Sequence, residues 1–336
     1  MPLPDPVWDY SYLIENALFD GDNFFIGCIS YEDRCMAAIN LSITSRTLPF
    51  FLFAVDDDEC SNPTWKEKCA SKTLRNWAKV EENFREIEIV GRMNKKTYKM
   101  SKRNEDVLHL IKDIEMLRAS HFYDRPSRCV LDVTCIPSFF ALQMMKAILE
   151  APLINELVVL YTKPDDYPEK VLKVSPPDKT RPDFLQLYGR KVRRNVKWIV
   201  SVGFDNDSVQ NAKRADESLT IDETYVVVPF PGYRPEYVVR CLTENSALLK
   251  RGQNFYYAPA DNPFKSYALI KELVKGDHNS FILSSFGPKP MAIGFALAAI
   301  EFGLPFLHVQ ATNYNPNFSS GSGKTMAFWV KHCCGI

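Results

Sequence analysis

The sequence lacks several features that mark common functional classes. Its 41 basic and 41 acidic residues cancel, so no net charge draws the protein toward nucleic acid or anionic lipid. The longest apolar run, at residues 291–300, is too short to cross a bilayer. The first ten residues, MPLPDPVWDY, do not have the basic-then-apolar pattern of a signal peptide. We therefore expect a cytoplasmic protein that makes no membrane contact.

Several sequence motifs are also missing, and each absence argues against one kind of chemistry. Without a G-x-G-x-x-G motif, a conventional NAD or FAD site is not expected. The chain has no G-x-S-x-G, complete P-loop or H-E-x-x-H motif either. Its nine cysteines include no C-x-x-C pair, which favours buried free thiols over a structural metal site. We expect no cofactor and no metal, and we assign no catalytic residue.

What the chain does have is a regular alternation of apolar strands and helices. With 46% hydrophobic and 24% charged residues it is globular, and 336 residues suffice for two domains. Alternation with short turns predicts parallel sheets with helices on both faces. The predicted strands are 24–29, 49–55, 85–90, 129–134 and 156–161 in the first half, and 197–202, 224–229, 254–258, 280–285, 305–310 and 325–331 in the second.

Three ordered pairs of segments indicate an internal repeat. Residues 24–39 match 198–212, residues 129–149 match 281–300, and residues 157–168 match 306–318. The predicted fold class is therefore α/β, with two tandem, internally repeated Rossmann-like units that each contain a doubly wound parallel sheet. We place the first unit at 1–173, a proline-rich and basic linker at 174–196, and the second unit at 197–336.

The turn after the first strand of each half is one candidate ligand site, because in a doubly wound sheet this turn borders the ligand crevice. Ser30 or Gly203 would let a ligand approach the backbone, and Tyr31 or Phe204 would stack on a base. The same residue types also suit a simple helix-capping turn, and both interpretations stay open. The candidates here are Ser30, Tyr31, Glu32 and Arg34, and in the second half Gly203, Phe204, Asp205 and Asn206.

The turn after the fourth strand is the stronger candidate. Lys289 lies between two prolines at a predicted helix start, where backbone N–H groups and its ammonium could hold a phosphate. The alternative is a lysine that reaches into solvent. Further candidates are Ser285 and Gly287 in this turn, and Thr134 and Cys135 in the matching turn of the first half. Gly232, Tyr233 and Arg234, which follow the predicted strand 224–229, are also candidates, although these three residues equally suit a rigid Pro-Gly turn.

These two turns resemble those of the CARF family, Rossmann-like sensors of cyclic oligonucleotides, and more loosely the fused-CARF SAVED domains. The turn 287–291, Gly-Pro-Lys-Pro-Met, is similar to a glycine- and lysine-containing element of many CARF domains. The chain differs in having no attached effector domain and no lysine in the matching turn of its first half. The resemblance implies a nucleotide held in a cleft between the two halves, and output through a separate effector protein.

The leading hypothesis is a nucleotide or cyclic-oligonucleotide sensing subunit of a prokaryotic antiviral defence system, with homo- or hetero-oligomers allowed. A second hypothesis is a nucleotide hydrolase or ring nuclease that acts in the same cleft, with Asp132, Asp205 or Ser285 near Lys289. A third is an assembly scaffold whose loops contact protein. Ligand turnover separates the first two, and the absence of any ligand-induced stabilisation favours the third.

Overall fold

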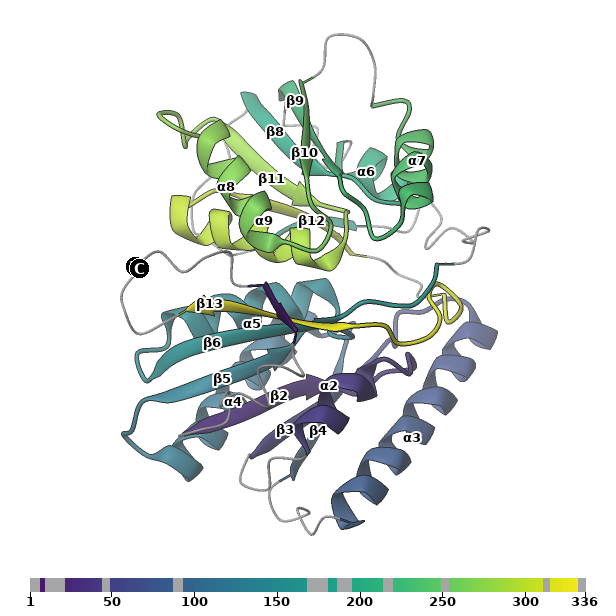
Figure 1. The fold of residues 1–336 in the computed structure, drawn as a ribbon, viewed down its shortest axis with the longest axis vertical. Helices are drawn as coiled ribbons and strands as arrows, with labels where there is room; N and C mark the ends of the chain where they lie inside the picture. Colours follow the sequence, from purple (N-terminus) through teal and green to yellow (C-terminus); the bar gives the residue numbers. More distant parts are fainter. Residues whose placement is uncertain are drawn as a thin grey trace. The chain divides into compact units, whose positions relative to one another are not determined.

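The fold is described by a computed structural model, which covers residues 7–9, 22–43, 49–86, 93–167, 181–185, 195–213, 220–248, 254–310 and 315–331. The chain is mixed α/β, with two sheets of mostly parallel strands in Rossmann-like units, as predicted (Figure 1). It divides into two compact units. Unit 1 is Met1–Leu172 with Asn313–Ile336, and unit 2 is Lys173–Thr312.

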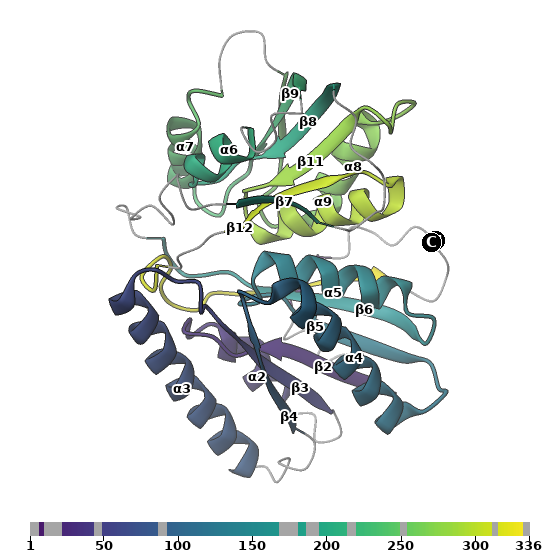
Figure 2. The same ribbon diagram turned by 180° about the vertical axis from the view of Figure 1, so that it is seen from behind.

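Unit 1 contains a sheet of order β1-β13-β6-β5-β2-β3-β4, in which β2 to β6 run parallel. Helices α2 and α3 cover one face and α4 and α5 the other (Figures 1 and 2). The strands are β1 (Val7–Asp9), β2 (Asn23–Cys28), β3 (Phe50–Asp56), β4 (Met93–Lys99), β5 (Ser127–Asp132), β6 (Ile154–Thr162) and β13 (Thr325–Lys331). The helices are α2 (Cys35–Ser42), α3 (Pro63–Glu86), α4 (Arg103–Phe122) and α5 (Ser138–Glu150).

Unit 2 contains a sheet of order β10-β9-β8-β11-β12-β7, in which β8 to β12 run parallel. Its strands are β7 (Arg181–Leu185), β8 (Asn195–Ser201), β9 (Thr220–Pro229), β10 (Asn254–Ala258), β11 (Phe281–Ser285) and β12 (Phe306–Gln310). Its helices are α6 (Asn206–Lys213), α7 (Pro235–Glu244), α8 (Pro263–Leu273) and α9 (Lys289–Phe302).

The five parallel strands have the same spatial order, 3-2-1-4-5, in both sheets, and each sheet continues into an antiparallel strand beside the fifth. In unit 1 that sixth strand is β13, from the far end of the sequence, and in unit 2 it is β7, which precedes the five parallel strands. β7 follows β6 along the chain but pairs with β12, whereas β13 follows β12 but pairs with β6. We call this an exchange of sixth strands, because each follows the fifth parallel strand of one sheet along the chain and pairs with that of the other. Tandem repetition itself stays a prediction.

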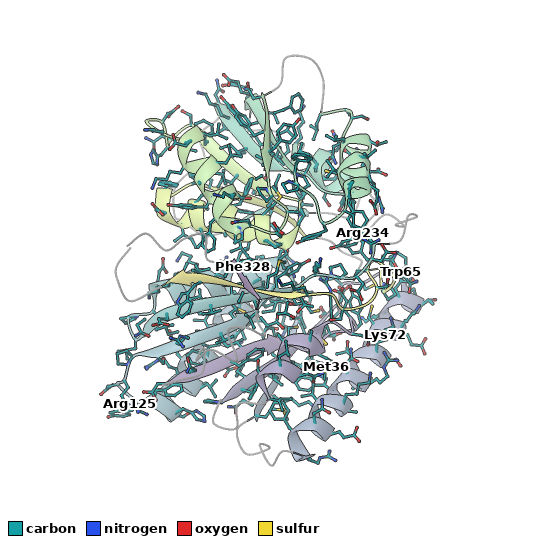
Figure 3. All side chains as sticks on the ribbon, viewed as in Figure 1. Met36, Trp65, Lys72, Arg125, Arg234 and Phe328 are labelled. Atoms are coloured by element: carbon teal, nitrogen blue, oxygen red, sulfur yellow. The ribbon has the colours of Figure 1, made fainter. Side chains whose placement is uncertain are left out.

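This exchange corrects the predicted unit boundaries. Residues 325–331 were expected in the second unit but form β13 in the sheet of unit 1, and β7 lies inside the predicted linker. The physical reason is the open edge of β6, against which Met326, Ala327 and Phe328 become buried. Figure 3 labels Phe328 on β13. Residues 325–331 would need the same apolar pattern whether they paired in the sheet of unit 1 or in that of unit 2. The sequence pattern alone therefore does not reveal which strand they pair with.

One predicted strand of unit 1 is wrong. Helix α3 continues through Glu86, and the third strand is instead β4, which lies in the basic stretch 92–103 that the sequence pattern predicts to be a loop. Residues 87–90 of the predicted strand lie outside the described residues. β4 is an edge strand on which only Tyr98 is buried, so it has no apolar run to identify it.

The central strands follow the rule for parallel strands buried on both faces. All six residues of β2 are buried, and so are the first four of β11. None of the helices in the described ranges combines the length and the apolar character that a membrane span requires.

Helices α8 and α9 in unit 2 pack closely because α9 has a glycine at their contact. A Cβ atom added to Gly294 would lie 2.1 Å from the Pro263 carbonyl oxygen and 2.9 Å from Cβ of Ser266. Glycine is otherwise a poor helix residue, so its presence in the middle of α9 serves this close approach.

We expect Gly294→Ala to destabilise the protein by about 2 kcal/mol, because the new methyl group forces the two helices apart. At an ordinary helix position the same substitution would stabilise by up to about 1 kcal/mol through helix propensity. Urea denaturation of both proteins measures the sign of the change. Increased stability of the variant would contradict the packing described here.

Candidate functional site

The strand order of each sheet reverses between the first and fourth strands, which are β2 and β5 in unit 1 and β8 and β11 in unit 2. The connections that follow these two strands run to opposite faces of the sheet. Ligands of open α/β sheets bind at the carboxyl ends of the strands where the order reverses in this way. In each unit the predicted turns after the first and fourth strands therefore lie at neighbouring strand ends.

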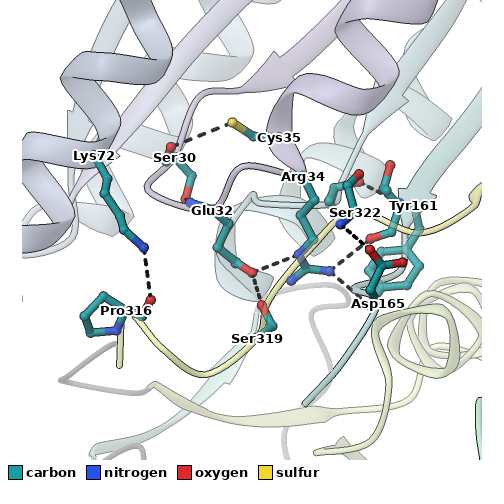
Figure 4. Close-up of polar contacts among 12 residues, drawn as sticks. Ser30, Glu32, Arg34, Cys35, Lys72, Tyr161, Asp165, Pro316, Ser319 and Ser322 are labelled. Atoms are coloured by element: carbon teal, nitrogen blue, oxygen red, sulfur yellow. Dashed lines mark hydrogen bonds and ion pairs between the residues drawn. The ribbon is translucent and has the colours of Figure 1, made fainter. Parts of the chain in front are cut away.

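In unit 1, the first turn contains an ion pair between buried Arg34 and partly buried Glu32 (Figure 4). Nε of Arg34 donates to Glu32 at 2.8 Å, and another guanidinium nitrogen donates to the Thr162 carbonyl at 3.0 Å and the Tyr161 hydroxyl at 3.3 Å. Burial alone would lower the pKa of Arg34, but Glu32 and the nearby tyrosines raise it above the ordinary value, so the guanidinium stays charged. The pair ties the start of α2 to the end of β6.

A segment from the far end of the sequence, residues 315–324, lies over this same turn of unit 1. We refer to it as the C-terminal strap. The Ser319 hydroxyl donates to Glu32 at 2.5 Å, Lys72 on α3 donates to the Pro316 carbonyl at 3.5 Å, and the Ser322 N–H donates to Asp165 at 3.0 Å (Figure 4). The crevice of unit 1 is thus engaged by the chain itself.

The strap contains the sequence Gly-Ser-Gly-Lys-Thr at 321–325, which is the second half of a P-loop motif. A P-loop leads into a helix, whereas this segment leads into strand β13. Gly321 has a φ of +70°, and the three atoms nearest to a Cβ added there all belong to Asp165. The strap glycines therefore accommodate a carboxylate of the same unit, and the motif is structural in this fold.

The second turn of unit 1 is held by a buried hydrogen-bond network. Asp132 accepts hydrogen bonds from the N–H and the hydroxyl of Thr134, and the Thr162 N–H donates to the Thr134 hydroxyl at 2.8 Å. Thr162 also shares a hydrogen bond of 2.8 Å with Thr325 on β13. Thr134 is completely buried and joins the ends of β5 and β6, while Cys135 beside it is half-buried.

In unit 2, the two turns contact each other through their backbones. A Cβ atom on Gly203 would lie 2.2 Å from the Phe286 carbonyl oxygen, and one on Gly287 would lie 3.1 Å from the Val202 oxygen. The Ser201 and Ser285 hydroxyls are hydrogen-bonded at 2.7 Å between the same strand ends. Gly203 was expected to admit a ligand, but its missing side chain makes room for the neighbouring turn.

Aromatic and cationic side chains gather after the first and second strands of unit 2. The Phe204 ring makes an edge contact with Tyr237, and the Arg240 guanidinium lies 4.4 Å from the Phe204 ring centroid. Arg234 lies 5.6 Å from the Tyr237 ring and is exposed. Phe204 and Arg234, predicted separately from two turns, are thereby linked through Tyr237.

The remaining predicted residues of unit 2 have structural contacts of their own. Asp205 accepts from the Ser208 N–H and hydroxyl at the start of α6, which is the capping role considered as the alternative. Asn206 accepts from Gln210 on the same helix. The Tyr233 hydroxyl donates to the Ala260 carbonyl at 3.2 Å, and a Cβ atom on Gly232 would meet Val238.

Lys289 is the first residue of α9 and follows the end of β11 by four positions, as the sequence predicts. Pro288 is the N-cap residue, so no side chain caps this helix start. Lys289 is half-buried and directly beside the contact between the two turns. Its ammonium and the positive end of the helix dipole favour an anion at the same place.

Two buried asparagines, which sequence reasoning missed, make the same contact in both units. Asn76 on α3 donates to the Ser30 carbonyl at 2.8 Å, and Asn245 after α7 donates to the Gly203 carbonyl at 2.7 Å. Both are completely buried, and the Oδ1 atom of each has no hydrogen-bond partner in the described part of the chain. The one feature of the sequence that could have revealed them is an Asn near the apolar face of the second helix in each half.

An acidic loop, Asp56 to Glu59, follows β3 in unit 1. Burial and the neighbouring carboxylates, Glu59 first among them, raise the pKa of Asp57 to about 7. Partial burial raises the pKa of Asp58, but hydrogen bonds from the Ser101 side chain and backbone N–H bring it below the ordinary value. No group of three or more metal-ligating side chains occurs among the residues with described positions, so this loop is not a metal site there.

No protein-family model matches the sequence, and no curated protein matches it either.

We expect Arg34→Met to destabilise the protein by about 3 kcal/mol, because it leaves Glu32 as a partly buried carboxylate without its cation. Hydrogen exchange in residues 315–324 should also become faster, since Glu32 holds Ser319. Chemical denaturation and hydrogen exchange with mass spectrometry measure the two effects. Ser319→Ala serves as a control: it should speed hydrogen exchange in the strap but leave the free energy of unfolding close to that of the wild type. Unchanged exchange in the strap of Arg34→Met would contradict this coupling.

The raised pKa of Asp57 makes stability depend on pH. Its unfolded pKa is about 3.9, so the native state binds the proton more tightly, and stability falls as pH rises from about 4 to about 7. Asp57→Asn should therefore stabilise the protein by about 2 kcal/mol at pH 8, after allowance for solvent screening, and have little effect at pH 4. Asp58→Asn should instead destabilise at pH 8. Equal effects of Asp57→Asn at both pH values would contradict the assignment.

Proposed function

We propose that unit 2 binds a nucleotide-type ligand at the carboxyl ends of β8 and β11, and that the chain is a sensing subunit acting on a separate effector protein. The observation that carries this proposal is Lys289, the first residue of a helix without a side-chain cap at the point where the strand order reverses. A phosphate is the ligand group that a lysine and a helix N-terminus favour together.

The two units differ at this place in a way that favours one site per chain. In unit 1 the corresponding helix, α5, starts at Ser138 and has no lysine in its first turn. The strap also engages Glu32 beside Arg34. Unit 2 has the lysine, and Tyr237 in this unit contacts both half-buried Phe204 of the first turn and the guanidinium of exposed Arg234.

Binding is better supported than cleavage. The side chains that a hydrolase would use are already engaged: Asp132 accepts from Thr134, Asp205 caps α6 and Ser285 bonds Ser201. A general base needs a carboxylate or imidazole within reach of the attacking group. A sensor needs only different affinities in two states of the protein, which a partner chain can detect. The similarity to CARF turns suggests a cyclic oligonucleotide and an antiviral setting.

The test is a thermal-shift screen against cyclic di-, tri- and tetranucleotides, NAD derivatives and nucleoside phosphates. We expect at least one compound at a concentration far above its Kd to raise the Tm by several degrees. Lys289→Ala should lose that shift. Lys275→Ala is the matched control, because Lys275 is exposed in the turn after α8 and pairs only at 3.9 Å with Glu272.

Chromatography of the stabilising compound after incubation separates the sensor from a hydrolase, since a sensor returns the compound intact. If Lys289→Ala kept the full shift in Tm, the ligand would bind elsewhere than at the start of α9, which would contradict the proposed site. The absence of a shift with every compound would overturn the nucleotide proposal and favour a scaffold.

A further inference from the structure

The third parallel strand forms one edge of each sheet, and the two edges have opposite character. In unit 1 this strand is β4, Met93–Lys99, which carries Lys95, Lys96 and Lys99. In unit 2 it is β10, Asn-Phe-Tyr-Tyr-Ala at 254–258, which carries no charge. Lysines on an edge strand prevent pairing with another chain, and β10 has no such protection.

The side chains of β10 are large, aromatic and exposed. Phe255 is 37% exposed and Tyr257 is 61% exposed, and Tyr257 makes an edge contact with Phe230, which is 55% exposed. The N–H of Phe230 donates to the Ala258 carbonyl and the Ala260 N–H to the Pro231 carbonyl, so the patch has a fixed backbone. Among the described strands β10 pairs only with β9, and its other edge has no strand beside it.

We infer that β10 pairs with β10 of a second copy of this chain, as antiparallel strands about a twofold axis at Tyr256. This register places Phe255 of each copy opposite Tyr257 of the other copy, and both pairs lie on the same face of the joined sheet. Phe255 and Tyr257 lie in register with Val226 and Val228 of β9, which fixes them on the same face.

Charge and side-chain pairing both favour a second copy as the occupant. A strand without charge can lie against itself with no like charges opposite, whereas β4 paired with itself would bring lysines together. Aromatic cross-strand pairs stabilise antiparallel strands, and a twofold axis forms each such pair two times. The strand is thus complementary to itself in both respects.

Sedimentation velocity over a concentration series tests the inference. The wild-type protein should form a species of twice the chain mass of 38.5 kDa. The double variant Phe255→Lys/Tyr257→Lys, which gives β10 the character of β4, should raise the Kd of the dimer about tenfold or more. Leu74→Lys on α3 is the control, because Leu74 is 70% exposed in unit 1 and should leave the dimer unchanged.

Cysteine cross-linking tests the register separately and does not rely on a destabilised interface. Under mild oxidation Tyr256→Cys should form a disulfide between two chains, because residue 256 faces its own copy across the axis. Asn254→Cys should not, because its copy lies about 13 Å away along the strand pair. A protein that stays monomeric, a dimer that the double lysine variant leaves intact, or equal cross-linking at both positions would each overturn the inference.

Discussion

The open edges of β6 and β12 impose the constraint on which the rest of the architecture depends. Each is the fifth parallel strand of its sheet, and each pairs on its far side with an antiparallel strand that follows the fifth strand of the other sheet along the chain. Backbone N–H and C=O groups of a buried strand need such partners. Because β13 returns to the sheet of unit 1 after the strands of unit 2, the chain passes from one unit to the other twice. Unit 1 is therefore made of two separate pieces of sequence, whereas unit 2 is the continuous stretch Lys173–Thr312.

The exchange also explains why the two related crevices differ. The chain that returns to unit 1 to form β13 must first cross the carboxyl edge of that sheet, and it does so as the strap over Glu32 and Asp165. Arg34, Tyr161 and Thr325 then hold strap and strand ends in place. Two sheet edges with the same topology therefore differ in what lies at them: the strap of the same chain in unit 1, and a lysine at a helix start in unit 2.

Much of the fold could be predicted from the sequence, because buried parallel strands are continuous apolar runs. β2 and β11 were found in this way, and the start of α9 at Lys289 followed from its prolines. β4 was missed because an edge strand needs no apolar run, and β13 was assigned to the wrong sheet because an apolar pattern does not name its partner. The candidate turns were located correctly at the strand ends, but their internal contacts could not be foreseen. The role of Gly203 depends on where the Phe286 carbonyl lies, and that of Glu32 on a serine almost three hundred positions away.

The crossed connectivity has a consequence for the order in which the protein is made. All six strands of unit 2 lie between residues 181 and 310, so that sheet can be completed as soon as this stretch has left the ribosome. The sheet of unit 1 begins earlier in the sequence but lacks β13 until residues 325–331 emerge. The half that is synthesised first is therefore the last to be finished, and during that interval the exposed edge of β6 is a place where a nascent chain could be recognised by a chaperone.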